Sequence, residues 1–499
     1  MIIFDFCPIS FVALRYFVYL CTRKIKIKQN TMEEIMNRPL IEQALESYGK
    51  EIEKLMKDYP CLSEVCKGLE VAAYPAALFV GGCFLGTLMT RCTYHYYYQR
   101  NLDRRLNYGI YIIGDPGTGK SFAGRLYNLI AGPIIQVSKE GMNAVNRYKR
   151  KYSEWEHGGQ KGDGPKKPKA LIRTHPARTS NKVLIEDMNN AIDIVDGEEM
   201  HLHLLSFDSE LENTIRLQTE SWNSKFFMEL KAFHNEEDGE CYVGGNLQPN
   251  FNVYWNYVYT GTPMALEHKV NQRNIGTGLA TRLAAIPMPS SHFKMLNREE
   301  YDGEYQEPEE DKTLRMWAER LDKEYGELPI RDLVEECYEW TKRRMEDAKD
   351  DESRVDELIC KRVGYYGVNV SVPFIMMRHW DEWKEHRTLT IDDTDRWLCQ
   401  LICKIQFSCQ HHFFGRYWES YFNEQRLFGM NAPLKKKRYR KEMKQRYCLL
   451  ADTFTTSDVI EQCHVSRSNA EKMIRRWKDE GYIVSEKRGV YQKVYYSLM

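Results

Sequence analysis

The sequence lacks a net charge of either sign, because 71 Lys and Arg residues balance 71 Asp and Glu residues. No overall electrostatic field attracts nucleic acid, so any basic patch must be local. The 14 cysteines include no Cys-x-x-Cys pair, which favours free thiols in a reducing cytoplasm over a disulfide framework. A hydrophobic content of 42% over 499 residues is typical of a soluble protein with several domains.

An uninterrupted membrane-spanning run is also missing. Residues 2–21 approach the required length, but Asp5, Pro8 and Arg15 interrupt them, and the basic residues follow the apolar segment. We therefore expect residues 1–31 to lie outside the folded unit, with no membrane contact; the alternative is a weak membrane anchor. The second apolar run, residues 71–90, contains one proline and three glycines, and we expect a buried helix pair there.

One motif dominates what is present. Residues 114–121 read GDPGTGKS, which meets the spacing G-x-x-x-x-G-K-[ST] between an apolar run and a helix-like stretch. Such a loop turns successive backbone N–H groups toward phosphate oxygens at a helix N-terminus. It predicts ATP bound with Mg²⁺ on an α/β P-loop fold, with Lys120 on the β- and γ-phosphates and Ser121 on the metal. The binding residues are Gly114, Asp115, Pro116, Gly117, Thr118, Gly119, Lys120 and Ser121.

A carboxylate at the end of a neighbouring strand must complete this site. Two apolar runs end in suitable pairs: residues 183–187 end in Glu186 and Asp187, and residues 202–210 contain Asp208 and Glu210. The spacing alone does not separate these alternatives.

Two further features follow along the chain. Residues 252–259 predict a strand that leads into Thr260, whose hydroxyl is a candidate sensor of the γ-phosphate or of the attacking water. A glycine-rich turn then precedes Arg282, a candidate for the γ-phosphate of the same site or of a neighbouring subunit.

The order of these features resembles a family of P-loop proteins of unknown function that is widespread on bacterial mobile genetic elements. Its members often accompany primase or primase-helicase modules. The resemblance covers about residues 65–415 and rests on GDPGTGKS (114–121), LLSFDSELENT (204–214), AFHNEE (232–237), YTGTP (259–263), TGLATRLAAIPMP (277–289) and KRVGYYGVNVSVPFIMMRHW (361–380).

The resemblance implies a RecA/AAA-like ATPase core. It also implies that the site uses Glu210 to polarise water, rather than Glu186 and Asp187. From the residue pattern we expect Asp208 to organise Mg²⁺, although an Asp before Ser209 is itself a departure from the family. The sequence departs from the family where Glu212 and Asn213 stand in place of a more usual Asp.

Other stretches are assigned by their periodicity. Residues 132–137 predict a second strand, residues 139–156 a basic helix, residues 157–169 a flexible insertion and residues 291–430 mostly helices. The group Cys399, Cys403 and Cys409, followed by two histidines, lies in an apolar helical pattern, so we expect packing rather than a zinc site.

The C-terminal segment reads as a separate module. Residues 434–499 contain sixteen Lys and Arg residues and eight Asp and Glu residues, a local charge of +8. Two short helices and a hairpin predict a winged helix that binds DNA. We expect Ser468 and Glu471 to form a capping box at the second helix. The candidate DNA contacts are Arg467, Asn469, Lys472, Arg475, Arg476, Lys487 and Arg488.

The sequence therefore predicts an N-terminal extension (1–31), a helical region (32–105), a P-loop ATPase core (106–290), a helical lid (291–433) and a winged helix (434–499). We expect a cytoplasmic, homo-oligomeric ATPase that acts on DNA as a helicase or remodelling factor of a mobile element, with a primase as a further partner. The alternatives are a nucleotide-switched DNA-binding regulator and an antiviral ATPase.

Overall fold

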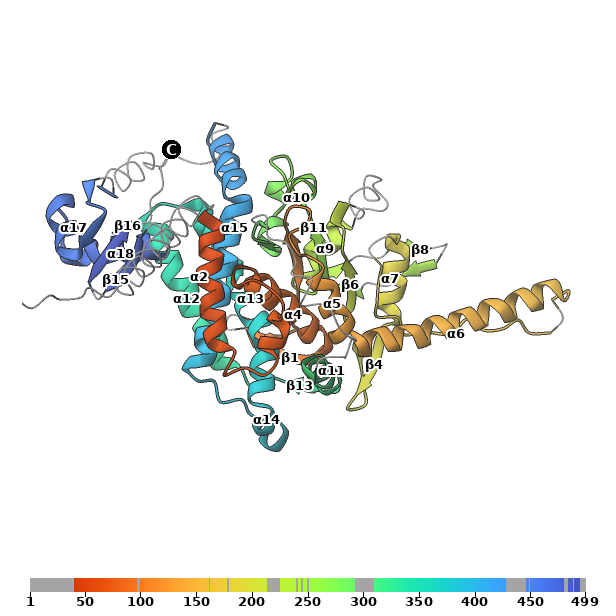
Figure 1. Ribbon diagram of the computed structural model, residues 1–499. Coiled ribbons are helices and arrows are strands. Elements are labelled where there is room, and N and C mark those ends of the chain that lie inside the picture. The colour runs from red at the N-terminus through yellow and green to blue at the C-terminus, as the bar shows by residue number, and fades with distance from the viewer. Residues whose placement is uncertain are drawn as a thin grey trace, which may run out of the picture. The chain divides into compact units, whose positions relative to one another are not determined.

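The computed structural model describes residues 40–96, 99–160, 162–176, 179–212, 225–238, 241–243, 246–248, 251–291, 309–427, 446–447, 449–479, 483–487 and 489–493 (Figure 1). These residues belong to two compact units, one spanning residues 45–434 and the other containing the C-terminal residues 435–499. The predicted N-terminal extension lies outside the described residues.

A four-stranded parallel sheet forms the centre of the larger unit. Its strands are β3 (Gly109–Ile113), β6 (Leu204–Asp208), β11 (Trp255–Gly261) and β12 (Ala284–Pro287), in the order β12-β3-β11-β6. Every residue of β3, β11 and β12 is buried, as expected for strands that are covered on both faces. The chain is therefore a mixed α/β protein with a parallel core, as the sequence predicts.

Alternating side chains of this sheet face two different helices. On one face α4 (Tyr74–Leu88) packs on β3, β11 and β12, and Asn256 of β11 donates to Thr87 Oγ1 at 3.0 Å. The next residue along β11, Tyr257, faces the buried Glu229 of α9 (Phe226–Ala232), whose charge raises the pKa of the tyrosine further beyond the effect of burial. The core therefore holds polar side chains on both faces of the sheet, Asn256 toward α4 and Tyr257 toward α9.

The expected helix pair at residues 71–90 is instead one helix. After a short turn η1 (Val71–Ala73), α4 runs without a break through Gly81, Gly82 and Gly86. Each glycine allows a close approach rather than a turn: a Cβ at Gly82 would lie 2.9 Å from the Val370 backbone, and one at Gly86 1.9 Å from the Tyr108 hydroxyl. Among the described residues, this is the one segment long and apolar enough to span a membrane, and 83% of it is buried within the fold.

Two other predictions were wrong because short apolar runs do not distinguish strand from helix. Residues 132–137 begin the long helix α6 (Gly132–His157), with Pro133 in its first turn, where a missing N–H costs nothing. Residues 183–187 lie in α7 (Asn181–Asn190), which begins after Ser180, and its buried Leu184 and Met188 have helical spacing. The basic helix predicted over residues 139–156 is confirmed as part of α6.

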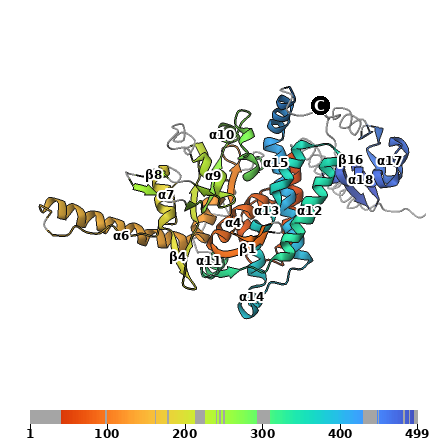
Figure 2. The ribbon, with the colours of Figure 1, turned by 180° about the vertical axis from the view of Figure 1, so that it is seen from behind.

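A helical layer follows the sheet in the chain, as predicted. It comprises α11 (Glu309–Leu321), α12 (Arg331–Asp350), α13 (Arg354–Arg378), α14 (Trp380–His386) and α15 (Asp393–Leu427). α13 is buried over most of its length between α4, α12 and α15, and α15 also packs on β12 (Figure 2). Cys337, Cys399 and Cys403 fill the space opposite Gly367, whose Cβ would lie 2.4 Å from Cys403 Sγ.

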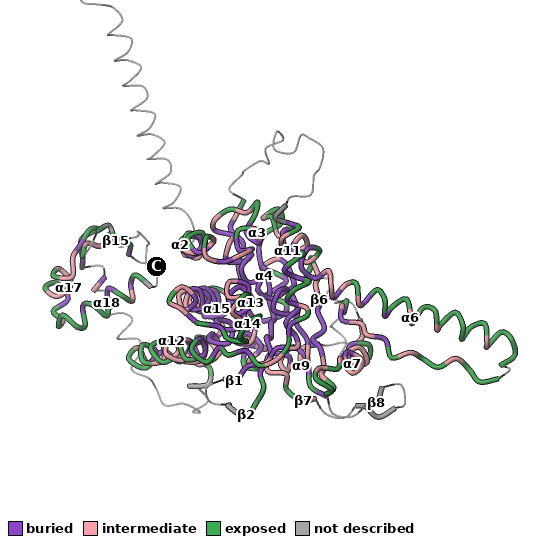
Figure 3. The backbone as a smooth tube through the Cα atoms, turned by 90° about the horizontal axis from the view of Figure 1, so that it is seen from below, coloured by how far each residue is buried: buried purple, intermediate pink, exposed green. Residues whose placement is uncertain are grey.

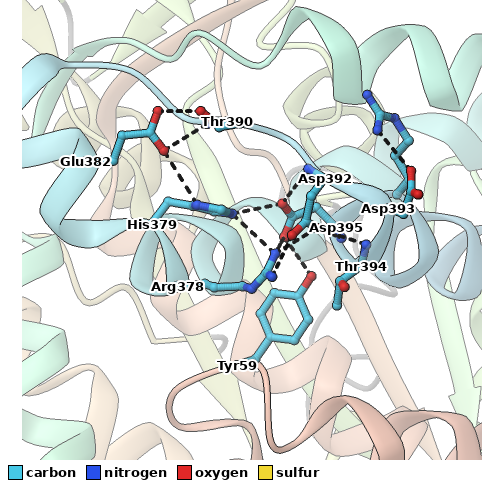
Figure 4. Close-up of polar contacts among 10 residues, drawn as sticks. Tyr59, Arg378, His379, Glu382, Thr390, Asp392, Asp393, Thr394 and Asp395 are labelled. Atoms are coloured by element: carbon cyan, nitrogen blue, oxygen red, sulfur yellow. Dashed lines mark hydrogen bonds and ion pairs between the residues drawn. The ribbon is translucent and has the colours of Figure 1, made fainter.

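A buried carboxylate fixes the junction between these helices. Asp395, in the first turn of α15, accepts hydrogen bonds from Tyr59 at 2.8 Å and from Arg378 at 2.9 Å, and lies 2.9 Å from His379 Nε2 (Figure 4). Arg378 also donates to Asp392 at 2.6 Å. The end of α13, the start of α15 and Tyr59 of the N-terminal region are therefore joined at this point.

The remaining elements of this unit are short, apart from the N-terminal helix. They are α2 (Leu40–Leu55), α3 (Leu62–Cys66), β1 (Arg91–Tyr96), β2 (Gln99–Arg104), β4 (Ile192–Val195), β5 (Glu198–His201), β7 (Glu237–Asp238), β8 (Cys241–Val243), β9 (Asn246–Gln248), β10 (Phe251–Asn252), α10 (Pro263–Lys269), η3 (Ile275–Thr277), η4 (Ala280–Arg282) and β13 (Tyr325–Glu327). The strands β1 and β2 end the N-terminal region, for which the pattern predicts helix as far as residue 105.

The C-terminal unit contains α17 (Thr456–Cys463) and α18 (Arg467–Asp479), which follow β14 (Thr453–Thr455) and precede the hairpin of β15 (Ile483–Lys487) and β16 (Val490–Lys493). Four apolar residues of α18 are buried in the core of this unit: Ala470, Met473, Ile474 and Trp477. The predicted capping box is wrong, because Ser466 accepts from Asn469 N at 3.4 Å and Glu471 pairs with Arg467 instead.

The close packing of α4 predicts a large effect from one methyl group. Gly86→Ala places a Cβ against the Tyr108 ring and should destabilise the larger unit by about 1–3 kcal/mol through overpacking. The matched control is Gly132→Ala, at the start of α6, where no atom lies within 4 Å of the new Cβ. Urea midpoints check both variants, and equal midpoints would contradict this account of the helix.

Candidate functional site

The glycine-rich loop lies where the carboxyl edge of the parallel sheet meets a helix N-terminus. Residues 114–121 connect β3 to α5 (Phe122–Ile130), the order that the sequence predicts. Gly117 and Gly119 have φ angles of 83° and 77°, which residues other than glycine rarely adopt. No atom lies within 4 Å of a Cβ placed at either residue, so the loop is open on that side.

Lys120 folds back over this loop. Its Nζ donates to the carbonyl oxygens of Gly114 at 2.5 Å and Asp115 at 2.7 Å. Burial lowers the pKa of Lys120, while the charges of Glu212 and Asp115 act to raise it. The ammonium therefore lies at the mouth of the loop, close to the Glu212 carboxylate, which follows β6 in the chain.

The ends of three strands meet beside the loop. Gly114 N donates to Gly261 O, the last residue of β11, at 3.0 Å. Asp208, the last residue of β6, pairs with Tyr259 on the other side of β11. Since adjacent strands lie about 4.8 Å apart, Asp208 and the loop are separated by roughly 10 Å at one edge of the sheet. This distance is suitable for a ligand that bridges the two strands.

Every second residue from the end of β6 onward carries a carboxylate: Asp208, Glu210 and Glu212. Asp208 Oδ1 accepts from the backbone N of Glu210 at 3.0 Å, which closes a turn, and the Glu210 side chain is exposed. Glu212 Oε1 accepts from the Thr262 hydroxyl at 2.6 Å and the Thr262 backbone N at 3.3 Å. Burial acts to raise the pKa of Glu212, but these hydrogen bonds and the charge of Lys120 outweigh it and lower the pKa.

The alternative carboxylates lie elsewhere. Glu186 forms an ion pair with Lys167, and Asp187 Oδ2 lies 3.0 Å from His175 Nδ1. His175 N donates to Leu205 O on the side of β6 away from β11. The structure therefore brings Asp208 and Glu210, and not Glu186 and Asp187, to the edge where the loop lies.

Thr260 is 2% exposed, and its hydroxyl donates to Ser209 O at 2.6 Å. It fixes β11 to the turn after β6 and does not face the open side of the loop. Thr262 occupies the edge instead, where its hydroxyl also accepts from Ala265 N and so caps α10. Sequence reasoning missed Thr262 and Glu212, although the alternation of Asp208, Glu210 and Glu212 was a visible signal.

Arg282 lies at the opposite edge of the sheet. It immediately precedes β12, whose Ala284 pairs with Ile110, and its carbonyl lies 2.8 Å from the Tyr366 hydroxyl that also contacts Gly109 O at 3.0 Å. The length of β3, about 13 Å at 3.3 Å per residue, separates this edge from the loop. The alternative in which Arg282 reaches a phosphate bound to its own chain is therefore wrong.

No protein family model and no curated protein matches this chain. Its function is therefore inferred from the sequence motifs and from the geometry of the site.

The predicted DNA contacts form a surface on the C-terminal unit. Arg467, Asn469, Lys472 and Arg475 are exposed on α18, and Arg476 is half-buried. Arg467 Nε lies 3.2 Å from Glu471 Oε1, a contact within one turn of the helix. Lys487 is exposed at the end of β15, and Arg488 lies outside the described residues.

The contacts of Glu212 predict a pH-dependent contribution to stability. Its pKa is lower in the folded state, so the stabilisation is present above its ordinary pKa of about 4.3. It is lost as the pH falls through the lower folded value. Glu212→Gln should therefore lower the urea midpoint at pH 7, and the difference should shrink below about pH 4. Glu210→Gln is the control, and the same pH dependence in both variants would contradict the assignment.

Proposed function

We propose that this protein is an ATP-hydrolysing P-loop protein that acts on DNA. The observation that carries the proposal is the meeting, at one sheet edge, of an open glycine loop, the Lys120 ammonium and the carboxylates at and just after the end of β6, two strands away from the loop strand. A triphosphate with its metal requires this combination, since a cation and backbone amides bind phosphate oxygens and carboxylates hold the hydrated Mg²⁺.

The arrangement of the sheet supports a RecA/AAA-like core. The strand β11 is inserted between the loop strand β3 and the acidic strand β6. In open parallel sheets, ligands bind beyond the carboxyl ends of the strands, where the strand order changes direction. The resemblance to the P-loop family of mobile elements supports the same reading, because residues 114–121, 204–212 and 259–263, which belong to three of its motifs, meet at this edge.

The described residues fit Mg-ATP. Gly117 and Gly119 leave space on the outer side of the loop, and Ser121 is exposed at the start of α5. We assign the phosphates to Lys120 and the loop amides, and the hydrated Mg²⁺ to Ser121 and Asp208. The exposed Glu210 polarises water, while Glu212 and Thr262 fix the relative positions of β6 and β11.

The C-terminal unit is proposed as the DNA-binding module. A helix–turn–helix followed by a β-hairpin is the winged-helix arrangement, in which the second helix enters the major groove. In support, the exposed side of α18 is basic while its apolar side forms the core of the unit. The local charge of +8 favours a polyanion such as DNA over a neutral or basic protein surface.

The cellular setting is part of the same proposal. We infer a cytoplasmic, homo-oligomeric ATPase that unwinds or remodels DNA of a mobile element together with a primase.

Lys120→Ala tests the site directly. Loss of the ammonium should weaken binding of a fluorescent ATP analogue by tenfold or more and abolish phosphate release, since it removes a charged contact worth about 1.5–3 kcal/mol. Unchanged circular dichroism and DNA binding would show that the fold is intact. Retained ATPase activity in the variant would refute the assignment.

The carboxylates provide a matched comparison. Glu210→Gln should reduce turnover by a factor of about 100 or more while leaving ATP bound, because a neutral amide does not polarise water. Glu186→Gln, on α7, should behave as the wild type. Single-turnover hydrolysis with radiolabelled ATP distinguishes the two, and a defect confined to Glu186→Gln would reverse the choice.

A further inference from the structure

The helix α6 projects from the larger unit as an arm. Its buried residues are Ile134, Ser138 and Gly141, all in its first half, and no later residue of α6 is buried. The remaining 16 residues, 142–157, extend about 24 Å at 1.5 Å per residue. Figures 1 and 3 show this exposed segment reaching away from the body of the unit.

Aromatic side chains occupy one stripe of the arm. The Tyr148 and Tyr152 rings lie 5.8 Å apart, and the Tyr152 and Trp155 rings 5.7 Å apart. Trp155 Nε1 donates to Gly162 O at 3.1 Å, and Gly164 packs against the same indole. This stripe therefore holds the returning chain, and the other flanks of the helix remain open.

Those flanks carry four basic side chains and two acidic ones, Glu154 and Glu156, so they are basic on balance. Arg147, Lys149, Arg150 and Lys151 are all exposed, and among the described residues none of these four forms an ion pair. At 100° per residue, Arg147, Arg150 and Lys151 share one flank. Two exposed lysines of the returning chain, Lys166 and Lys169, add to the positive charge. Like charges within one helical turn destabilise a helix, and this segment gains no stability from burial in a core.

A polyanion would remove this repulsion. We propose that the exposed half of α6, residues 142–157, is a second DNA contact, made to the phosphate backbone and therefore independent of sequence. The inference rests on the proposed action on DNA and goes beyond it by placing a DNA contact on the ATPase unit itself. Phosphates are the matching partner because the arm presents closely spaced cations on an exposed helix, while the whole chain carries no net charge.

The test uses the full chain with Arg147, Lys149, Arg150 and Lys151 all changed to Ala, which preserves helix propensity. A matched control neutralises four exposed cations on other helices, Arg331, Lys342, Lys349 and Arg354. Fluorescence anisotropy with labelled single-stranded and duplex DNA, between about 50 and 200 mM salt, gives the dependence of affinity on salt. A third variant changes Lys472 and Arg475 of α18 to Ala.

The slope of log affinity against log salt should fall by about 0.9 on duplex DNA for each arm charge that contacts a phosphate, hence by about 3 to 4 in the arm variant. The control should keep the wild-type slope, and ATP hydrolysis without DNA should be unchanged in both. Wild-type affinity and slope in the arm variant would overturn the inference, as would an altered oligomeric state with unchanged DNA binding. Failure of the wild type to bind DNA would instead overturn the proposed function, and the inference with it.

Discussion

The candidate site depends on a close contact at the end of β11. The carbonyl of Gly261 accepts from Gly114 N, which fixes the start of the loop, and a Cβ at Gly261 would lie 2.7 Å from Leu211 Cβ. Leu211 is buried at this point, between the exposed Glu210 and the anchored Glu212. A residue without a side chain therefore brings the loop and the carboxylate turn to the same strand end.

Close contacts at glycines also join the helical layer to the start of β3. The glycines of α4 admit Val370 of α13 at Gly82 and Tyr108, just before β3, at Gly86, one turn further along the same face of the helix. Tyr108 in turn donates to the Asn369 carbonyl, and Tyr94 donates to the Asn369 side chain at 2.9 Å. The strand that leads into the loop is thus held by two helices that are far apart in the sequence. The helices α4 and α13 together therefore fix the start of β3.

Much of this architecture could be predicted from the sequence where the local pattern is specific. The loop, the strand before Thr260, the helical region and the paired helices of the C-terminal unit all carry strong signals in spacing or composition. Short apolar runs do not carry such a signal. Residues 132–137 and 183–187 are helical because Pro133 and the Ser180 N-cap outweigh the local β propensity. The glycines of α4 were also misread, because close packing between helices is not visible in one segment.

Positions that depend on topology could not be predicted. The sequence indicates that Arg282 follows a glycine-rich turn, but the parallel direction of β12 places it at the amino edge of the sheet. Thr260 and Thr262 differ by two residues, and only the register of β11 shows that the first is buried and the second lies at the edge. Glu212 is held by a hydrogen bond from Thr262 and by the charge of Lys120, and both residues lie far from it in the chain.

The most direct measurement of the central claim is phosphate release from ATP by the intact protein, with and without Mg²⁺ and with and without single-stranded or duplex DNA. The account predicts hydrolysis that requires Mg²⁺ and is stimulated by DNA, because the proposed nucleotide site and the basic surfaces belong to one chain. Hydrolysis that is indifferent to DNA would contradict the coupling. Absence of hydrolysis under every condition would contradict the assignment of the site as an ATPase.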